Sequence, residues 1–183
     1  MRAPWRIPDA ERAGAAKFAL SFATLIVAWA CLHDLHLVGI EPRHFTEYHR
    51  PLLPLHDHRL LAVQYAIVAT LGPGIAFGFL AWAACRAGRK PPRNLGPVLG
   101  GFLALITAVE IALIAVGRWA DHRADAGLPP LYPAGLYPDL TRGILCTQTI
   151  NLTAYWLAPA CGALYLLAIR RTRRGGARAQ DRD

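Results

Sequence analysis

The stretch LGPVLGGFLALITAVEIALIAVG, residues 95–117, contains a single charged residue, Glu110, among otherwise apolar side chains. A helix needs about 20 such residues to cross the roughly 30 Å of hydrocarbon in a bilayer. Three more stretches have the same character, at residues 18–38, 60–84 and 143–169. The sequence therefore predicts an all-α polytopic membrane protein in which residues 18–169 form a bundle of four transmembrane helices.

Composition supports this fold class. The 183 residues are 54% hydrophobic and only 17% charged, whereas about a quarter of a soluble domain is charged. The four spans use most of the chain and leave no room for a separate soluble domain. The lipid bilayer is thus the expected partner. Nucleic acid is not expected despite the net charge of +8, because the basic residues follow the pattern of a membrane topology.

Fourteen of the 20 basic residues lie before the first span, between the second and third spans, or after the fourth. Basic residues concentrate on the cytoplasmic side of membrane proteins. This distribution predicts an N-in/C-in topology, in an inner (cytoplasmic) membrane if the chain is bacterial. The predicted segments are a cytoplasmic N-terminal segment 1–17, outward loops 39–59 and 118–142, and a basic cytoplasmic tail 170–183.

The end of the first span allows a second interpretation. Ala28-Trp29-Ala30 resembles the small-x-small site of a cleaved secretory signal peptide, which would remove residues 1–30. The apolar run is long for a signal peptide, so we expect a retained span. The residues that follow it face outward in either case.

The four cysteines include no CxxC pair, which counts against a thiol–quinone oxidoreductase. Cys31 and Cys146 lie near the outer ends of their spans, where a disulfide could join them. Buried unreactive thiols are the favoured expectation, because free cysteine behaves as a small hydrophobic residue.

Histidines concentrate on the predicted outer side. Neutral imidazole is a ligand for Cu, Zn, Ni and Fe, and a neighbouring carboxylate orients the ring. One hypothesis is therefore a transition-metal site, for Cu or Zn, although no HExxH motif is present. The alternatives are histidines solvated at the membrane interface and a pH-responsive rim. The candidate ligands are His33, His36, His44, His49, His56, His58 and His122.

A second group of candidates surrounds Glu110. At about 1.5 Å per helical residue, Glu110 lies ~8 Å below the outer boundary, at the depth of polar residues on two other spans. A carboxylate in hydrocarbon is costly, so it is expected to be functional or partnered. It could relay protons, bind a cation, anchor an amine or hydroxyl, or simply hold the bundle together. The predicted ligand pocket comprises Glu110, Gln64, Gln148, Asn151, Tyr155 and Asp34.

Small residues predict where helices approach closely. Gly74 and Gly78 form a GxxxG pattern in the second span, and Gly96 and Gly100 form another in the third. Such patterns let helix backbones approach in lipid. We therefore expect the second and third spans to pack tightly at their cytoplasmic ends, with a bend at Pro73.

Three positions carry an outline resemblance. Asp34 lies near the end of the first span, Gln64 precedes Pro73 in the second, and Tyr155-Trp-Leu-Ala-Pro159 lies in the fourth. The pattern resembles the EXPERA (emopamil-binding and sigma-2 receptor-like) membrane family, which has four helices with both termini inside. The resemblance implies a pocket for a sterol-like molecule. Because Gln64 stands where the family has an acid, and the histidine-rich loop has no counterpart there, no site residue is carried over.

Three functions remain open at this point. The leading one is binding or handling of a transition metal or another cationic ligand on the outer side. The second is a pocket for a lipid, sterol or quinone, with or without isomerase or oxidoreductase chemistry. The third is a role as an accessory subunit of a larger membrane complex or a homo-oligomer. No catalytic residue is assigned, because nucleophilic triads and phosphate loops are absent from the sequence.

Overall fold

The computed structural model describes residues 7–49, 52–87, 92–137 and 141–174, and all these residues are in helices or connecting turns. The all-helical prediction is confirmed. In chain order the elements are α1 (Asp9–Ile40), α2 (Arg43–Thr46), α3 (His58–Arg86), α4 (Leu95–Asp125), the 3-10 turn η1 (Ala134–Leu136) and α5 (Arg142–Arg174).

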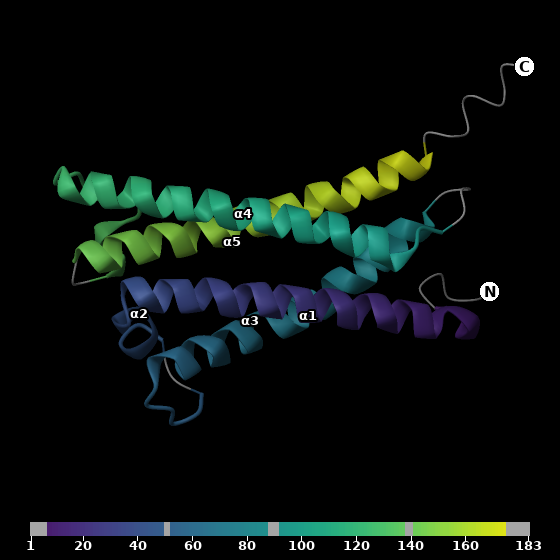
Figure 1. Ribbon diagram of the computed structural model, residues 1–183, viewed down its shortest axis with the longest axis horizontal. Helices are drawn as coiled ribbons and strands as arrows, with labels where there is room; N and C mark the ends of the chain where they lie inside the picture. Colours follow the sequence, from purple (N-terminus) through teal and green to yellow (C-terminus); the bar gives the residue numbers. More distant parts are fainter. Residues whose placement is uncertain (1–6, 50–51, 88–91, 138–140, 175–183) are drawn as a thin grey trace, which may run out of the picture.

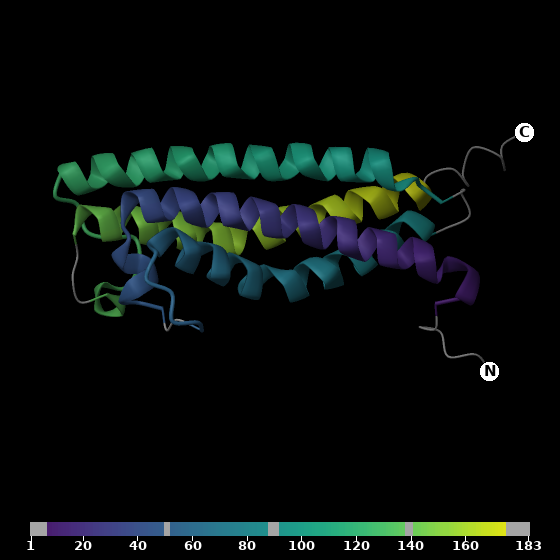
Figure 2. The ribbon, with the colours of Figure 1, turned by 60° about the horizontal axis from the view of Figure 1, so that its bottom comes forward.

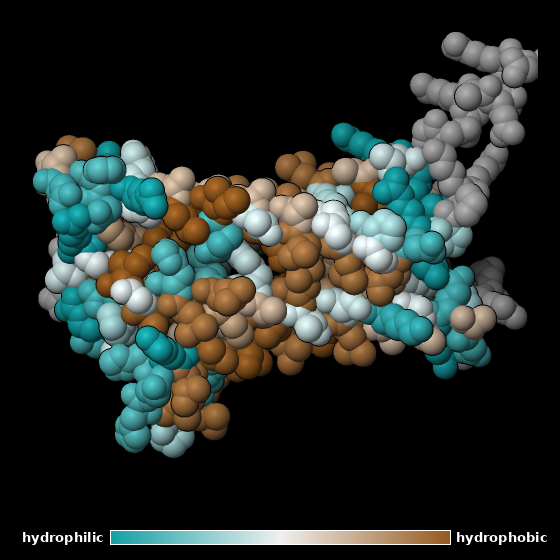
Figure 3. Space-filling model, viewed as in Figure 1, coloured by the Kyte–Doolittle hydropathy of each residue, from teal (hydrophilic) through white to brown (hydrophobic). Residues whose placement is uncertain are grey.

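Four of these helices, α1, α3, α4 and α5, are long and apolar enough to cross a membrane. Hydrophobic side chains cover the middle of the molecule and hydrophilic ones cover both ends (Figure 3). The helices extend beyond the predicted spans, and α4 continues to Asp125 rather than ending at 117. The extension follows from Arg118–Asp125, which contains no proline or glycine to end a helix.

The long helices form two antiparallel pairs, α1 with α3 and α4 with α5 (Figure 1). The pairs meet less extensively, where α3 contacts α5 and where α1 contacts α4 and α5. The start of α1 and the end of α5 lie at one end of the bundle, and α2 lies at the other (Figure 2). The histidine-rich connection between α1 and α3 is thus far from the start of α1 and the end of α5.

The α1–α3 pair is close because small residues face each other. A Cβ atom at Gly74 would lie 2.8 Å from the Ala23 Cα, and one at Gly78 would lie 2.5 Å from the Ala19 Cα. Real Cβ atoms do not approach a backbone so closely, so glycine is required at both positions. The two alanines complete a small-xxx-small interface between the helices.

This finding corrects the predicted partner of the GxxxG pattern. Gly96 and Gly100 have no atoms within 4 Å of a Cβ position, and α3 and α4 form no packed pair in the described part of the chain. A GxxxG pattern predicts that one helix face is smooth, but it does not predict which helix packs against that face. Here α1, which precedes α3 in the chain, presents the matching alanines.

Aromatic rings join the two pairs at the end nearer the termini. Phe22 of α1 is fully buried, and its ring centroid lies 5.5 Å from that of Phe77 on α3 and 5.0 Å from that of Phe102 on α4. Tyr165 of α5 packs on Phe102 at 5.7 Å. Such tilted ring pairs contribute about 0.5–1.5 kcal/mol each beyond the area they bury. All four long helices therefore meet in one aromatic cluster.

Substitutions in the two glycine patterns should separate a packed glycine from an exposed one. Gly78→Ala places a methyl group against the backbone of α1 and should destabilise the protein by about 1–3 kcal/mol, as overpacking does. Gly100→Ala is the matched control, because open space surrounds Gly100 and alanine favours a helix. Thermal unfolding of the purified variants in detergent measures both. Equal melting temperatures for the two variants would contradict the α1–α3 interface.

Candidate functional site

Glu110 lies in the apolar middle of α4 and is held by two donors from α1. The Trp29 indole N–H donates to Oε2 at 2.9 Å, and His33 Nδ1 lies 3.0 Å from the same oxygen and 3.3 Å from Oε1. Trp29 and His33 are one helical turn apart, so one face of α1 presents both donors. The carboxylate thus bridges the two helix pairs.

This group has hydrogen-bonding capacity to spare. An ionised carboxylate offers about four lone-pair sites, and Trp29 and His33 approach only some of them. The Glu110 side chain remains 22% exposed. His33 is 4% exposed, and its Nε2 atom has no hydrogen-bond partner among the described residues. Asp34, the next residue on α1, is half-buried beside the pair.

A second polar cluster forms around His44, which the short helix α2 turns into the bundle. His44 is 2% exposed. The amide Nε2 of Gln148 donates to its Nδ1 at 2.7 Å, and the amide nitrogen of Asn151 lies 3.5 Å from its Nε2. His49 donates from Nδ1 to the carbonyl oxygen of His44 at 2.7 Å and packs its ring 4.5 Å away.

Burial lowers the pKa of His44 to about 3, because the imidazolium would lose its hydration; neighbouring His49 and His33 lower it further. His44 is therefore neutral at physiological pH. A neutral ring has one acceptor nitrogen, and the Gln148 amide occupies it. The ring is thus a structural acceptor at the α2 end of the bundle.

Gln64 connects α3 to the segment that precedes it. Its Oε1 accepts the backbone N–H of Leu53 at 2.9 Å. Its Nε2 and the Oε1 of fully buried Gln148 have no hydrogen-bond partner within the described segments. Buried polar atoms are almost always bonded to protein or water. One donor and one acceptor thus remain available to a bound molecule.

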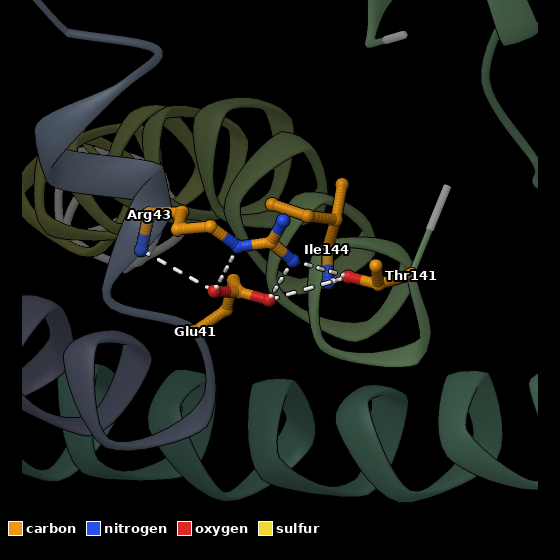
Figure 4. A network of polar contacts seen from close by, with 4 residues as sticks. All are labelled: Glu41, Arg43, Thr141 and Ile144. Atoms are coloured by element: carbon orange, nitrogen blue, oxygen red, sulfur yellow. Dashed lines mark hydrogen bonds and ion pairs between the residues drawn. The ribbon is translucent and has the colours of Figure 1, made fainter. Parts of the chain in front are cut away.

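The corner between α1 and α2 is tied to the start of α5 by a charged network (Figure 4). Arg43 donates from Nε to Oε1 of Glu41 at 3.0 Å and from Nη2 to Oε2 at 2.8 Å. The Thr141 hydroxyl accepts from Arg43 Nη2 at 2.8 Å and from the backbone N–H of Ile144 at 3.4 Å. The Arg43 hydrogen bond lowers the pKa of Glu41, so this carboxylate stays ionised although it is only 8% exposed.

Gly143 is part of the same contact. A Cβ there would lie 2.7 Å from Oε2 of Glu41. The absence of a side chain lets the carboxylate reach the first turn of α5. Through its hydrogen bonds with Thr141, this ion pair links the two helix pairs at the end opposite the aromatic cluster.

The structure divides the predicted pocket. Glu110 contacts His33. Gln148 and Asn151 lie beside His44, and Gln64 binds the backbone of the loop. Tyr155 is 60% exposed, and the described residues give it no hydrogen bond to the other predicted pocket residues. Spacing along α5 aligned Tyr155 with Asn151, but it could not show how far the covered part of that face extends.

The predicted metal ligands do not converge. His36, His56, His58 and His122 are exposed, while His33 and His44 point into separate polar clusters. The described residues include all seven histidines, and no group of three or more His, Cys, Asp or Glu side chains among them could hold a metal ion. The metal hypothesis gains no support. Histidines that are close together in the sequence do not have to bring their side chains to one point in the fold.

Three contributors were not predicted as site residues. Trp29, the Glu41–Arg43 pair and Thr141 all form contacts between segments distant in sequence. The four-residue interval from Trp29 to His33 was a usable signal for the first, since it places both residues on one helix face. No local pattern distinguishes the ion pair from other surface charges.

No protein-family model, no curated protein and no solved structure matches this chain.

The neutral state of His44 predicts a pH dependence of stability. Its pKa in the folded state lies below its unfolded value of about 6.5, so between those pH values the unfolded chain binds the proton and the folded chain does not. Stability is therefore complete above pH 6.5 and falls as the pH decreases. Between pH 7.5 and 5 the loss should be about 2 kcal/mol, at roughly 1.4 kcal/mol per pH unit below 6.5.

The experiment compares thermal unfolding at pH 7.5 and 5 in three proteins. His44→Gln should show a weaker pH dependence than the parent, because the titrating group is gone. His56→Gln removes an exposed histidine and should keep the parental dependence. A His44→Gln profile parallel to that of the parent would show that His44 titrates normally in the folded state.

Proposed function

We propose that this chain binds an amphiphilic molecule of the lipid, sterol or quinone class, whose hydroxyl or amine group is held by Glu110. The observation that supports this most directly is the Glu110 carboxylate itself. It lies in the apolar middle of α4, it is oriented by Trp29 and His33, and it is still partly accessible.

The hydrogen-bonding pattern favours a donor ligand. Trp29 and His33 occupy the carboxylate as donors, and the remaining lone pairs can accept an O–H or an ammonium N–H. With its proton on Nδ1, His33 offers Nε2 as a further acceptor. A transition metal would need three or more ligands converging on one point, whereas a hydroxyl or amine needs one or two acceptors.

The surroundings favour an apolar body for the ligand. The two helix pairs contact each other less extensively than the helices within each pair. Figure 3 shows hydrophilic residues inside the hydrophobic band, between the pairs and nearer the α2 end. Val109 and Leu113 of α4 and Leu37 of α1 belong to the apolar cluster of this region. A hydrophobic molecule entering from the bilayer would thus meet a polar group at one depth.

The topology that accompanies this proposal places both termini in the cytoplasm, which is supported by the concentration of basic residues near the termini and the second loop. The ligand site then lies in the outer half of the membrane. A tag at the C-terminus should be inaccessible from outside intact cells, and a tag inserted near His56 should be accessible. The reverse labelling pattern would contradict the orientation but not the site.

Glu110→Gln should separate binding from folding. The amide has nearly the shape of the carboxylate, so the variant should fold, but it loses the charge and brings its own N–H groups toward Trp29 and His33. We expect binding of a hydroxyl or amine ligand to weaken roughly tenfold, since hydrogen bonds to charged groups contribute about 1.5–3 kcal/mol. Glu47→Gln, at an exposed position, is the matched control.

The measurement combines two readouts. Mass spectrometry identifies lipids, sterols and quinones that co-purify with the parent and are depleted in Glu110→Gln. Thermal stabilisation is then measured with a sterol, its methyl ether and a long-chain amine, since the ether cannot donate a hydrogen bond. If the ether stabilises the parent as well as the sterol does, or if Glu110→Gln responds like the parent, Glu110 is not the ligand anchor.

A further inference from the structure

A cavity of about 350 Å³ lies at the end of the bundle opposite the histidines, between the first turn of α4 and the last turns of α5. Its volume falls within the usual range of small-molecule sites. Arg93, Asn94 and Thr172 line it with polar groups, and Pro97, Ala168 and Ile169 line it with apolar groups. The cavity is therefore amphiphilic.

The polar side carries a positive charge that no carboxylate in the described segments neutralises. Arg93 donates from Nη2 to the Thr172 hydroxyl at 2.9 Å, and no ion pair of the described residues includes it. Arg86, by contrast, is paired with Glu11. A guanidinium has five N–H donors in a planar arrangement, so Arg93 can hold a second oxygen ligand while it contacts Thr172.

The start of α4 adds to this positive field. Asn94 is the N-cap residue, and its side chain makes no capping hydrogen bond. The free N–H groups of a first helical turn and the helix dipole favour an anion at this position. The guanidinium and the helix end thus border the same cavity, whose other wall is apolar.

We propose that this cavity binds a phosphate group, supplied either by the headgroup of an anionic lipid or by a soluble phosphate compound. The Arg93 guanidinium can form two parallel hydrogen bonds to phosphate oxygens. The apolar wall of Pro97, Ala168 and Ile169 contacts the glycerol and first methylene groups when the phosphate belongs to a lipid. This site is independent of Glu110 and of the ligand proposed there.

The experiment uses the full chain purified in an uncharged detergent and titrated with three probes. They are dioctanoyl phosphatidic acid, dioctanoylglycerol, which has the same tails without phosphate, and inorganic phosphate. Binding is measured from thermal stabilisation and from tryptophan fluorescence. We expect the parent to bind phosphatidic acid at least tenfold more tightly than dioctanoylglycerol.

Three variants locate the binding. Arg93→Gln should weaken phosphatidic acid binding roughly tenfold, the loss expected for a hydrogen bond to a charged group. Arg170→Gln is the control. Arg170 is an exposed arginine near the end of α5, but it does not line the cavity, so this variant should change binding less than about twofold. Ala168→Phe fills the apolar wall, so it should weaken lipid binding without weakening inorganic phosphate.

The outcomes distinguish the sources. Tighter binding of phosphatidic acid than of inorganic phosphate, lost in Ala168→Phe, identifies a lipid headgroup. Equal binding of both, lost only in Arg93→Gln, identifies a soluble phosphate. If dioctanoylglycerol binds as well as phosphatidic acid, or if Arg93→Gln and Arg170→Gln lose binding equally, the phosphate site does not exist and general surface charge explains the attraction.

Discussion

A carboxylate in the apolar middle of a helix bundle must find donors, and this requirement at Glu110 constrains how the two helix pairs meet. Among the described residues, only α1 supplies donors to it, from Trp29 and His33. The face of α1 that carries them is turned by about 80° from the face with Ala19 and Ala23, at 3.6 residues per turn. One helix can therefore pack tightly on α3 and satisfy α4 at the same time.

The two ends of the bundle are joined by different forces. Near the termini, Phe22, Phe77 and Phe102 bury aromatic surface among three helices. At the α2 end, the Arg43–Thr141 and His44–Gln148 hydrogen bonds connect the corner of α1 and α2 to α5 and the residue before it. Polar contacts in a low-dielectric interior are strong when every partner is present and costly when one is missing. The α2 end is therefore the more sensitive to substitution and to pH.

The sequence predicted the helices well, because a long apolar run without charges indicates a helix whatever its distant contacts are. It predicted the surroundings of Glu110 only in part. The depth estimate brought Glu110, Gln148 and Asn151 to one level, but the Gln148 amide donates to His44, and the Asn151 amide lies beside the same ring. That arrangement requires α2 to turn inward. The hydrogen bond between Arg43 and Thr141, which are 98 residues apart in the sequence, holds α2 in this position. Periodicity predicts which residues share a helix face, but it does not predict which helix packs against that face. The predicted packing of Gly78 against the third span was therefore wrong.

Metal binding needs free lone pairs on imidazole, and this determines how the histidine-rich stretch should be interpreted. The acceptor nitrogen of His44 is used by Gln148, so a metal would have to displace that amide. Glu110 holds Nδ1 of His33 and leaves Nε2 free, but the described residues place no group of three His, Cys, Asp or Glu side chains that could hold a metal ion. Of the two buried histidines, His33 keeps one open nitrogen, and its other nitrogen contacts a partly accessible carboxylate. A carboxylate that already accepts from two donors has lone pairs left for a hydroxyl or an ammonium group. The same residues that suggested a metal from their composition therefore favour, by their arrangement, an organic ligand with a single polar group.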